Sequence, residues 1–144
     1  MFLRPEQPDN HDSLTTSALS SHWIMSNSRP TSCFAGTRLE ALLALQRYTE
    51  VKSIITVAGS WVHQHCESNG VACDLVQKKS KHSAFKMLAQ QTTSLVLSAG
   101  FPFILPGCVL SSSPSFLNSH PSLLPNYKGV NPIKEAFCKG EEYM

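Results

Sequence analysis

The chain has 144 residues, of which 42% are hydrophobic, and this is enough to bury one core, so a single domain is expected. Its formal net charge is only +2, which disfavours a surface built for nucleic acid or for membrane headgroups. The five cysteines are scattered and form no CxxC pair, so the sequence predicts neither a disulfide framework nor a zinc site, and a cytoplasmic location is favoured. The longest apolar stretch, residues 94–110, is interrupted by prolines and is too short to cross a bilayer as one helix.

Residues 1–31 differ in composition from the rest of the chain. They are rich in Ser, Pro, Asn and His and show little apolar periodicity, so burial of apolar side chains would hardly offset the conformational entropy lost on ordering. We therefore expect a flexible N-terminal extension at 1–31, in which Trp23 and Ile24 either dock on the domain or stay exposed. The expected domain covers residues 32–144.

Strand-like and helix-like patterns alternate from residue 32 onward. Apolar, β-branched runs predict strands, and leucines at helical spacing predict the first helix. The predicted strands are 32–36, 51–58, 71–76, 94–98 and 115–118, and the predicted helices are 38–48, 61–69 before Gly70, and 81–91 with Ser80 as its cap. This alternation predicts an α/β, Rossmann-like fold with a mostly parallel sheet and flanking helices.

Three loops follow predicted strands at the places where parallel sheets bind ligands. They are FAGT at 34–37, SAGFPFILP at 98–106 and NSHPSLLPNYKG at 118–129. The first has a single glycine in place of a GxGxxG pattern, which disfavours a dinucleotide site.

The third loop carries the best candidates for chemistry. Asn118 and His120 are two residues apart at a strand end, so their side chains project to the same side of an extended chain. An amide donor suits a developing oxyanion, and imidazole can donate or accept a proton near neutral pH. Pro121 and Pro125 stiffen the loop. Taken alone, however, a histidine before proline is more often a structural turn residue than a catalyst.

The run NSHPSLLPNYKG resembles the signature of the folate-dependent formyltransferase family. The second loop resembles the cofactor loop of that family, and FAGT looks like the start of its methionyl-tRNA formyltransferase version. The matching residues of the second loop are Ala99, Gly100, Phe101, Ile104, Leu105 and Pro106. On this resemblance, residues 32–144 are identified as a partial formyltransferase-like catalytic domain.

The resemblance implies formyl transfer from 10-formyltetrahydrofolate to an amine acceptor. Asn118 and His120 would be catalytic: both would stabilise the oxygen that gains negative charge, and His120 would help to move the amine proton. The implied cofactor-binding residues are Gly100, Phe103, Ile104, Leu105, Ser122, Leu123 and Leu124. Three acceptors stay open: methionyl-tRNA, an amino-sugar nucleotide and glycinamide ribonucleotide. The residues FAGT and 131–133 slightly favour the first two. Lys128 would either contact an anionic acceptor or stay solvated.

The sequence departs from the family pattern at one catalytic position. Family members carry an aspartate several tens of residues beyond the histidine, whereas the aspartates here are Asp9, Asp12 and Asp74, all before His120. That carboxylate would orient His120 and favour its protonated form. Two interpretations stay open: a fragment of an active enzyme, with the sheet incomplete at its C-terminal end, or a non-catalytic folate-binding or vestigial module.

Two further readings compete with this one. One alternative is a metal site formed by His63, His65, Cys66 and Cys73. Residues two apart on a helix, such as 63 and 65, point in different directions, so we expect no metal. The other alternative is an RNA contact by four basic residues, Lys78, Lys79, Lys81 and His82. A cluster of basic side chains at a helix start is more often a solvated face of the helix.

Overall fold

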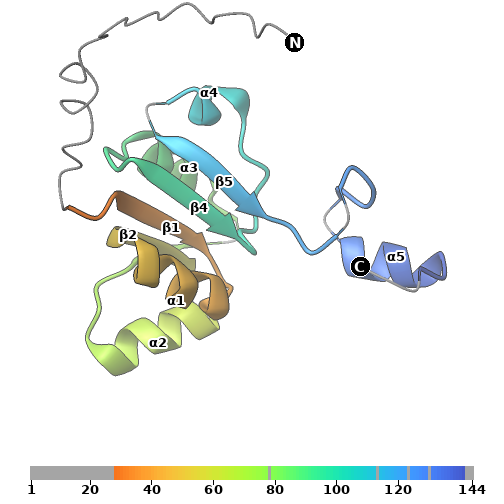
Figure 1. The fold of residues 1–144 in the computed structure, drawn as a ribbon, viewed down its shortest axis with the longest axis horizontal. Helices are drawn as coiled ribbons and strands as arrows, with labels where there is room; N and C mark the ends of the chain where they lie inside the picture. Colours follow the sequence, from red (N-terminus) through yellow and green to blue (C-terminus); the bar gives the residue numbers. More distant parts are fainter. Residues whose placement is uncertain (1–27, 78, 113, 123, 130, 142–144) are drawn as a thin grey trace, which may run out of the picture.

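Strands and helices alternate along the part of the chain that the computed structural model describes, residues 28–77, 79–112, 114–122, 124–129 and 131–141 (Figure 1). The strands are β1 (Thr31–Gly36), β2 (Glu50–Val57), β3 (Asp74–Val76), β4 (Leu95–Ala99) and β5 (Ser115–Ser119). The helices are α1 (Leu39–Tyr48), α2 (Trp61–Asn69), α3 (Lys81–Ala89), α4 (Gly107–Leu110) and α5 (Pro132–Cys138). The predicted α/β class is confirmed.

The strands form one sheet in the order β3-β2-β1-β4-β5, and each pair of neighbours is parallel. The Rossmann-like parallel sheet expected from the sequence is therefore confirmed. Its register aligns Gly36 with Ala99, and Ala99 with Ser119. As a result β1, β4 and β5 end at the same level, and the loops that follow them start side by side.

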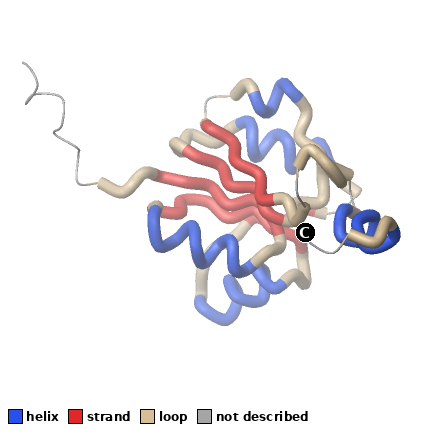
Figure 2. The backbone as a smooth tube through the Cα atoms, turned by 45° about the vertical axis from the view of Figure 1, so that its right-hand side comes forward, coloured by secondary structure: helices blue, strands red, loops and turns tan. Residues whose placement is uncertain are grey.

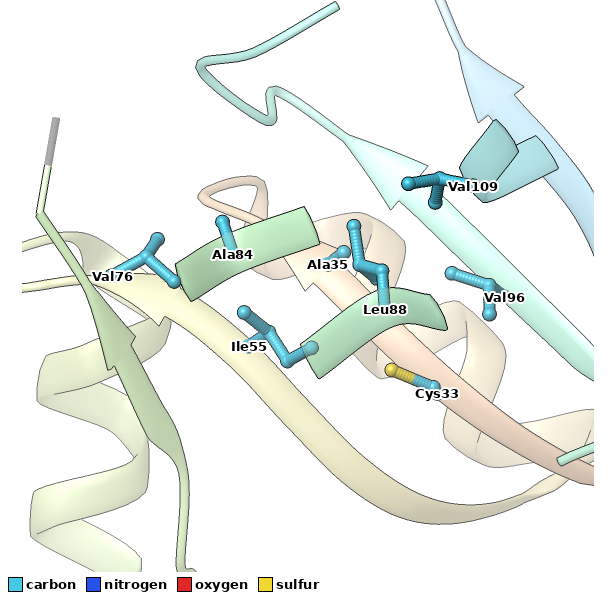
Figure 3. Close-up of a cluster of buried hydrophobic side chains, with 8 residues drawn as sticks. All are labelled: Cys33, Ala35, Ile55, Val76, Ala84, Leu88, Val96 and Val109. Carbon is cyan, nitrogen blue, oxygen red and sulfur yellow. The ribbon is translucent and has the colours of Figure 1, made fainter. Parts of the chain in front are cut away.

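Helices cover both faces of the sheet, with α1 and α2 on one face and α3 and α4 on the other (Figures 1 and 2). Successive side chains of a strand point to opposite faces, so β1 supplies both cores. Its Phe34 packs with the α1 and α2 cluster, whereas Cys33 and Ala35 pack with the α3 and α4 cluster. Figure 3 shows Leu88 of α3 over Ala35 in this second cluster.

Most observed bounds lie within one residue of the predicted ones, and two differ by more. The third strand starts at Asp74 rather than at residue 71, because only residues 74–76 pair with β2. Helix α3 ends at Ala89 rather than at residue 91. Ser80 is the N-cap residue of α3, as predicted, but its side chain makes no capping hydrogen bond.

Two helices had no counterpart in the sequence prediction. The first, α4, has only four residues, too few to show an apolar period. The second, α5, begins with Pro132, a residue favoured in the first helical turn because its ring presets φ. The apolar residues of α5, at positions 132, 133, 136 and 137, recur at helical spacing, so this pattern was a sequence signal for the helix.

Residues 1–27 of the predicted extension at 1–31 lie outside the described residues. The two alternatives for Trp23 and Ile24 fall in this part of the chain. Thr31 is already the first residue of β1. Within the described ranges, every helix is too short or too polar to cross a membrane.

Candidate active site

A cavity of about 1380 Å³ lies at the carboxyl edge of the sheet. The loops after β1, β4 and β5 line it together with α5, as expected for a parallel sheet whose neighbouring strands end at one level. The lining includes Arg38 after β1, Gly100, Phe103, Ile104 and Leu105 after β4, Asn118 and His120 at the end of β5, and Ile133 and Phe137 of α5. Residues that are far apart in the sequence thus share one concave surface.

Two glycines let the ends of β1 and β4 approach closely. A Cβ atom at Gly36 would lie 1.9 Å from the Ala99 carbonyl oxygen, and one at Gly100 would lie 2.8 Å from Thr37 Oγ1. Gly100 also has a φ of 66°, in the left-handed region that favours glycine. The Ala99 oxygen accepts hydrogen bonds from the amides of Thr37, at 3.0 Å, and Arg38, at 3.3 Å. These bonds fix one wall of the cavity to the sheet.

Aromatic side chains anchor the loop that follows β4. The Phe103 ring meets the Phe101 ring edge to face at 5.5 Å and the Phe85 ring of α3 at 6.0 Å. Phe101, Phe103 and Leu105 also pack against the core beneath the sheet. Ile104, between them, is 86% exposed and lines the cavity. The loop therefore presents apolar surface from a fixed backbone.

Asn118 and His120, the two predicted catalytic residues, both line this cavity. Asn118 is exposed near the end of β5, and His120 is half-buried directly after the strand. His120 Nε2 lies 2.9 Å from the carbonyl oxygen of Tyr127. Because a carbonyl oxygen only accepts, this geometry requires the hydrogen on Nε2. The catalytic roles of both residues stay predictions.

The predicted cofactor residues divide into two groups. Gly100, Phe103, Ile104 and Leu105 line the cavity, whereas Ser122 and Leu124 are outside its lining, and Leu123 falls outside the described residues. The Ser122 hydroxyl donates to the carbonyl oxygens of Asn126, at 3.1 Å, and Tyr127, at 3.2 Å. Ser122 thus supports the loop from within.

Three cationic side chains line the cavity, those of Arg38, Lys128 and Lys134. Of these, the sequence indicated only Lys128 as a contact for an anionic acceptor. All three face the same space as one carboxylate, Glu40. The signal for Arg38 was its place directly after β1. The signal for α5, which carries Lys134, was the spacing of its apolar residues after Pro132.

The residues of the alternative metal reading make other contacts. His63 Nδ1 accepts from the Gly59 amide at 3.1 Å, while its Nε2 lies 3.5 Å from Glu67. Burial, reinforced by the neighbouring Cys73 thiol, raises the pKa of Cys66 to about 11, so this thiol is protonated near neutral pH. In the described part of the chain, no group of three or more His, Cys, Asp or Glu residues is arranged to hold a metal ion. Lys79, Lys81 and His82 are exposed and lie outside the cavity lining.

The sequence model of the formyl transferase family matches residues 31–144. The mitochondrial methionyl-tRNA formyltransferase of Saccharomyces cerevisiae is 40% identical over 48 residues, covering 33% of this chain and 12% of that protein. The methionyl-tRNA formyltransferase of Thermus thermophilus is 31% identical over 85 residues, covering 58% of this chain and 28% of that protein. This chain thus aligns with less than a third of the length of either relative.

Among solved structures, the fold is similar to that of a phosphoribosylglycinamide formyltransferase from Streptococcus pneumoniae TIGR4. The TM-score is 0.62 and the identity 20%, with 78% of this chain and 67% of that chain covered. At this identity the likeness supports the fold. It gives no information on the acceptor.

Proposed function

Because the chain belongs to the formyl transferase family, we propose that it transfers a formyl group from 10-formyltetrahydrofolate to an amine acceptor. One observation carries the proposal: Asn118 and His120 line the same cavity as the loop after β4. A proton-transfer group and an amide donor therefore adjoin an apolar wall on which a ligand can rest.

The residues of the cavity fit a folate donor in size and in chemistry. The volume of about 1380 Å³ exceeds the roughly 300–1,000 Å³ of a pocket for one drug-sized ligand, which leaves room for a donor and part of an acceptor. Phe103, Ile104 and Leu105 provide apolar surface for a planar ring. These residues would hold the donor.

Bound in this way, the donor supplies a formyl carbon whose oxygen gains negative charge when an amine attacks it. The Asn118 amide is suited to donate a hydrogen bond to that oxygen, and such a donor typically contributes 10²–10³ in rate. His120 is suited to take up or release the amine proton. The acceptor is an amine attached to an anionic group, because Arg38, Lys128 and Lys134 line the cavity. Methionyl-tRNA, an amino-sugar nucleotide and glycinamide ribonucleotide all meet this description.

Transfer of a labelled formyl group to methionyl-tRNA, and in separate assays to an amino-sugar nucleotide and to glycinamide ribonucleotide, tests this function. We expect transfer by the chain to fall by about 10²–10³ in Asn118→Ala, because one oxyanion donor is lost. His120→Ala should lower it by a similar or larger factor. Asn126→Ala is the matched control, because Ser122 uses the backbone carbonyl of Asn126, which alanine keeps. Full activity in His120→Ala would contradict the proposal.

Calorimetry with a stable 10-formyl folate analogue separates binding from transfer. Binding together with transfer supports the enzyme. Binding without transfer to any of the three acceptors is the result expected of a fragment that lacks the catalytic aspartate, and equally of a non-catalytic folate-binding or vestigial module. Absence of binding contradicts both.

The location of the protein in the cell stays a sequence-based prediction. The cysteine pattern favours the cytoplasm. One matched relative, however, is a mitochondrial protein.

A further inference from the structure

Two side chains that follow β5 donate hydrogen bonds to one backbone atom, the carbonyl oxygen of Tyr127. His120 Nε2 lies 2.9 Å from this oxygen, and Ser122 Oγ lies 3.2 Å from it. A carbonyl oxygen has two lone pairs and can accept both bonds. The orientation of the His120 ring is thus tied to the backbone seven residues further along the chain.

The backbone at Tyr127 has an unusual conformation that side-chain contacts support. Its φ is 52°, in the left-handed region that residues other than glycine seldom adopt. The Tyr127 hydroxyl donates to the Glu141 carboxylate, and Lys139 Nζ lies 5.1 Å from the centre of the ring. Both partners follow α5. The ring therefore joins the loop after β5 to the segment after α5, and this link holds the Tyr127 carbonyl in place.

From this geometry we infer that Tyr127 is a positioning residue for His120: its carbonyl keeps the hydrogen on Nε2 and leaves Nδ1 as the nitrogen that gains or loses a proton. The catalytic meaning of this arrangement rests on the proposed function, but the arrangement itself does not. A histidine is commonly oriented by a carbonyl or carboxylate that accepts from one ring nitrogen. A carbonyl fixes the tautomer without adding a negative charge beside the ring. The Glu141 carboxylate raises the pKa of Tyr127, so the phenol stays protonated as the donor.

The tautomer of His120 can be measured by nitrogen-15 NMR of the imidazole in the 144-residue chain, with the signals assigned from their loss in His120→Gln. In the neutral ring we expect the ratio of the Nε2-protonated to the Nδ1-protonated form to exceed that of an exposed histidine by roughly fivefold or more, the effect of about one net hydrogen bond. A ratio equal to or below that of an exposed histidine would overturn the inference.

Variants of Tyr127 test whether this residue causes the bias. Tyr127→Ala removes the ring contacts, and alanine disfavours the left-handed φ, so the His120 signals should move toward those of an exposed histidine. Tyr127→Phe keeps the ring and loses only the hydroxyl, so it should shift them less. Tyr48→Ala is the matched control, because Tyr48 is exposed at the end of α1.

If Tyr127→Ala leaves the His120 signals as unchanged as Tyr48→Ala does, with both variants folded by circular dichroism, Tyr127 has no positioning role. The measurement needs neither folate nor acceptor. A fixed tautomer without formyl transfer would therefore contradict the proposed function alone.

Discussion

Gly36 is the residue on which the junction between β1 and β4 depends most directly. The oxygen that a Cβ atom would strike at 1.9 Å belongs to the backbone of Ala99 and cannot rotate away. The same oxygen accepts the amide hydrogens of Thr37 and Arg38, so moving it also disturbs the start of the loop that carries Arg38 into the cavity. A side chain at this position would therefore affect both stability and the site.

We expect Gly36→Ala to lower the free energy of unfolding by about 3 kcal/mol or more, the upper end of the range for overpacking, because two strand ends must separate. Gly107→Ala is the matched control, since a Cβ atom there meets no atom within 4 Å. Urea unfolding of both variants measures the difference. A loss below ~1 kcal/mol in Gly36→Ala would show that β1 and β4 can move apart easily.

The two serines that precede α2 and α3 show how similar sequence signals give different helix ends. Ser60 has an extended backbone, with φ −70° and ψ 162°, and its hydroxyl accepts from the His63 amide at 3.2 Å. Ser80 has φ −112° and ψ 75°, and its side chain makes no capping bond. The backbone before the helix decides whether the serine caps it, and the residue type does not reveal that conformation.

Replacing each serine by alanine measures this difference. Ser60→Ala should lower the free energy of unfolding by roughly 1 kcal/mol, because the cap of α2 and the 2.9 Å bond between the Ser60 and Thr56 hydroxyls are both lost. In Ser80→Ala the change should stay within about 0.5 kcal/mol. Thermal unfolding of the two variants compares them, and equal losses would contradict the capping role of Ser60.

Elements with a clear run, period or end signal were predictable from the sequence, and the shortest ones were not. Strand β1 and helix α2 match their predicted ranges to within one residue, because apolar runs and the left-handed Gly70 mark their ends. Helix α4 has only four residues, too few to show an apolar period, and helix α5 has seven, so its apolar spacing covers less than two full turns. Tertiary contacts determine such short elements.

At the scale of the whole molecule, the site follows from the topology of the sheet. The carboxyl ends of β1, β4 and β5 meet, so three loops recognised separately in the sequence line one cavity. This convergence was predictable once the strands were taken as parallel. The contribution of α5 to the cavity lining was not predictable, because nothing in the sequence relates Ile133 or Phe137 to Asn118. Side-chain contacts such as that of His120 with Tyr127 also required coordinates.

The two sides of the cavity should differ in local stability. Strand β1 is paired on both sides, and residues 32–36 are buried. Helix α5 lies beyond the end of β5, away from the sheet, and its Phe137 is 81% exposed (Figure 1). Local opening of a segment with few buried apolar contacts costs little free energy, whereas a central strand exchanges its amide hydrogens only when the domain opens.

We therefore expect the amides of α5 to exchange with deuterium on the order of 1,000-fold faster than those of β1, if global opening costs at least about 5 kcal/mol. Helix α1 is the internal comparison, because it also faces solvent but buries Leu42 and Leu45, and it should be intermediate. Mass spectrometry of peptides covering the three elements measures their rates. Exchange in α5 as slow as in α1 would contradict this prediction and would mean that α5 is a fixed wall of the cavity.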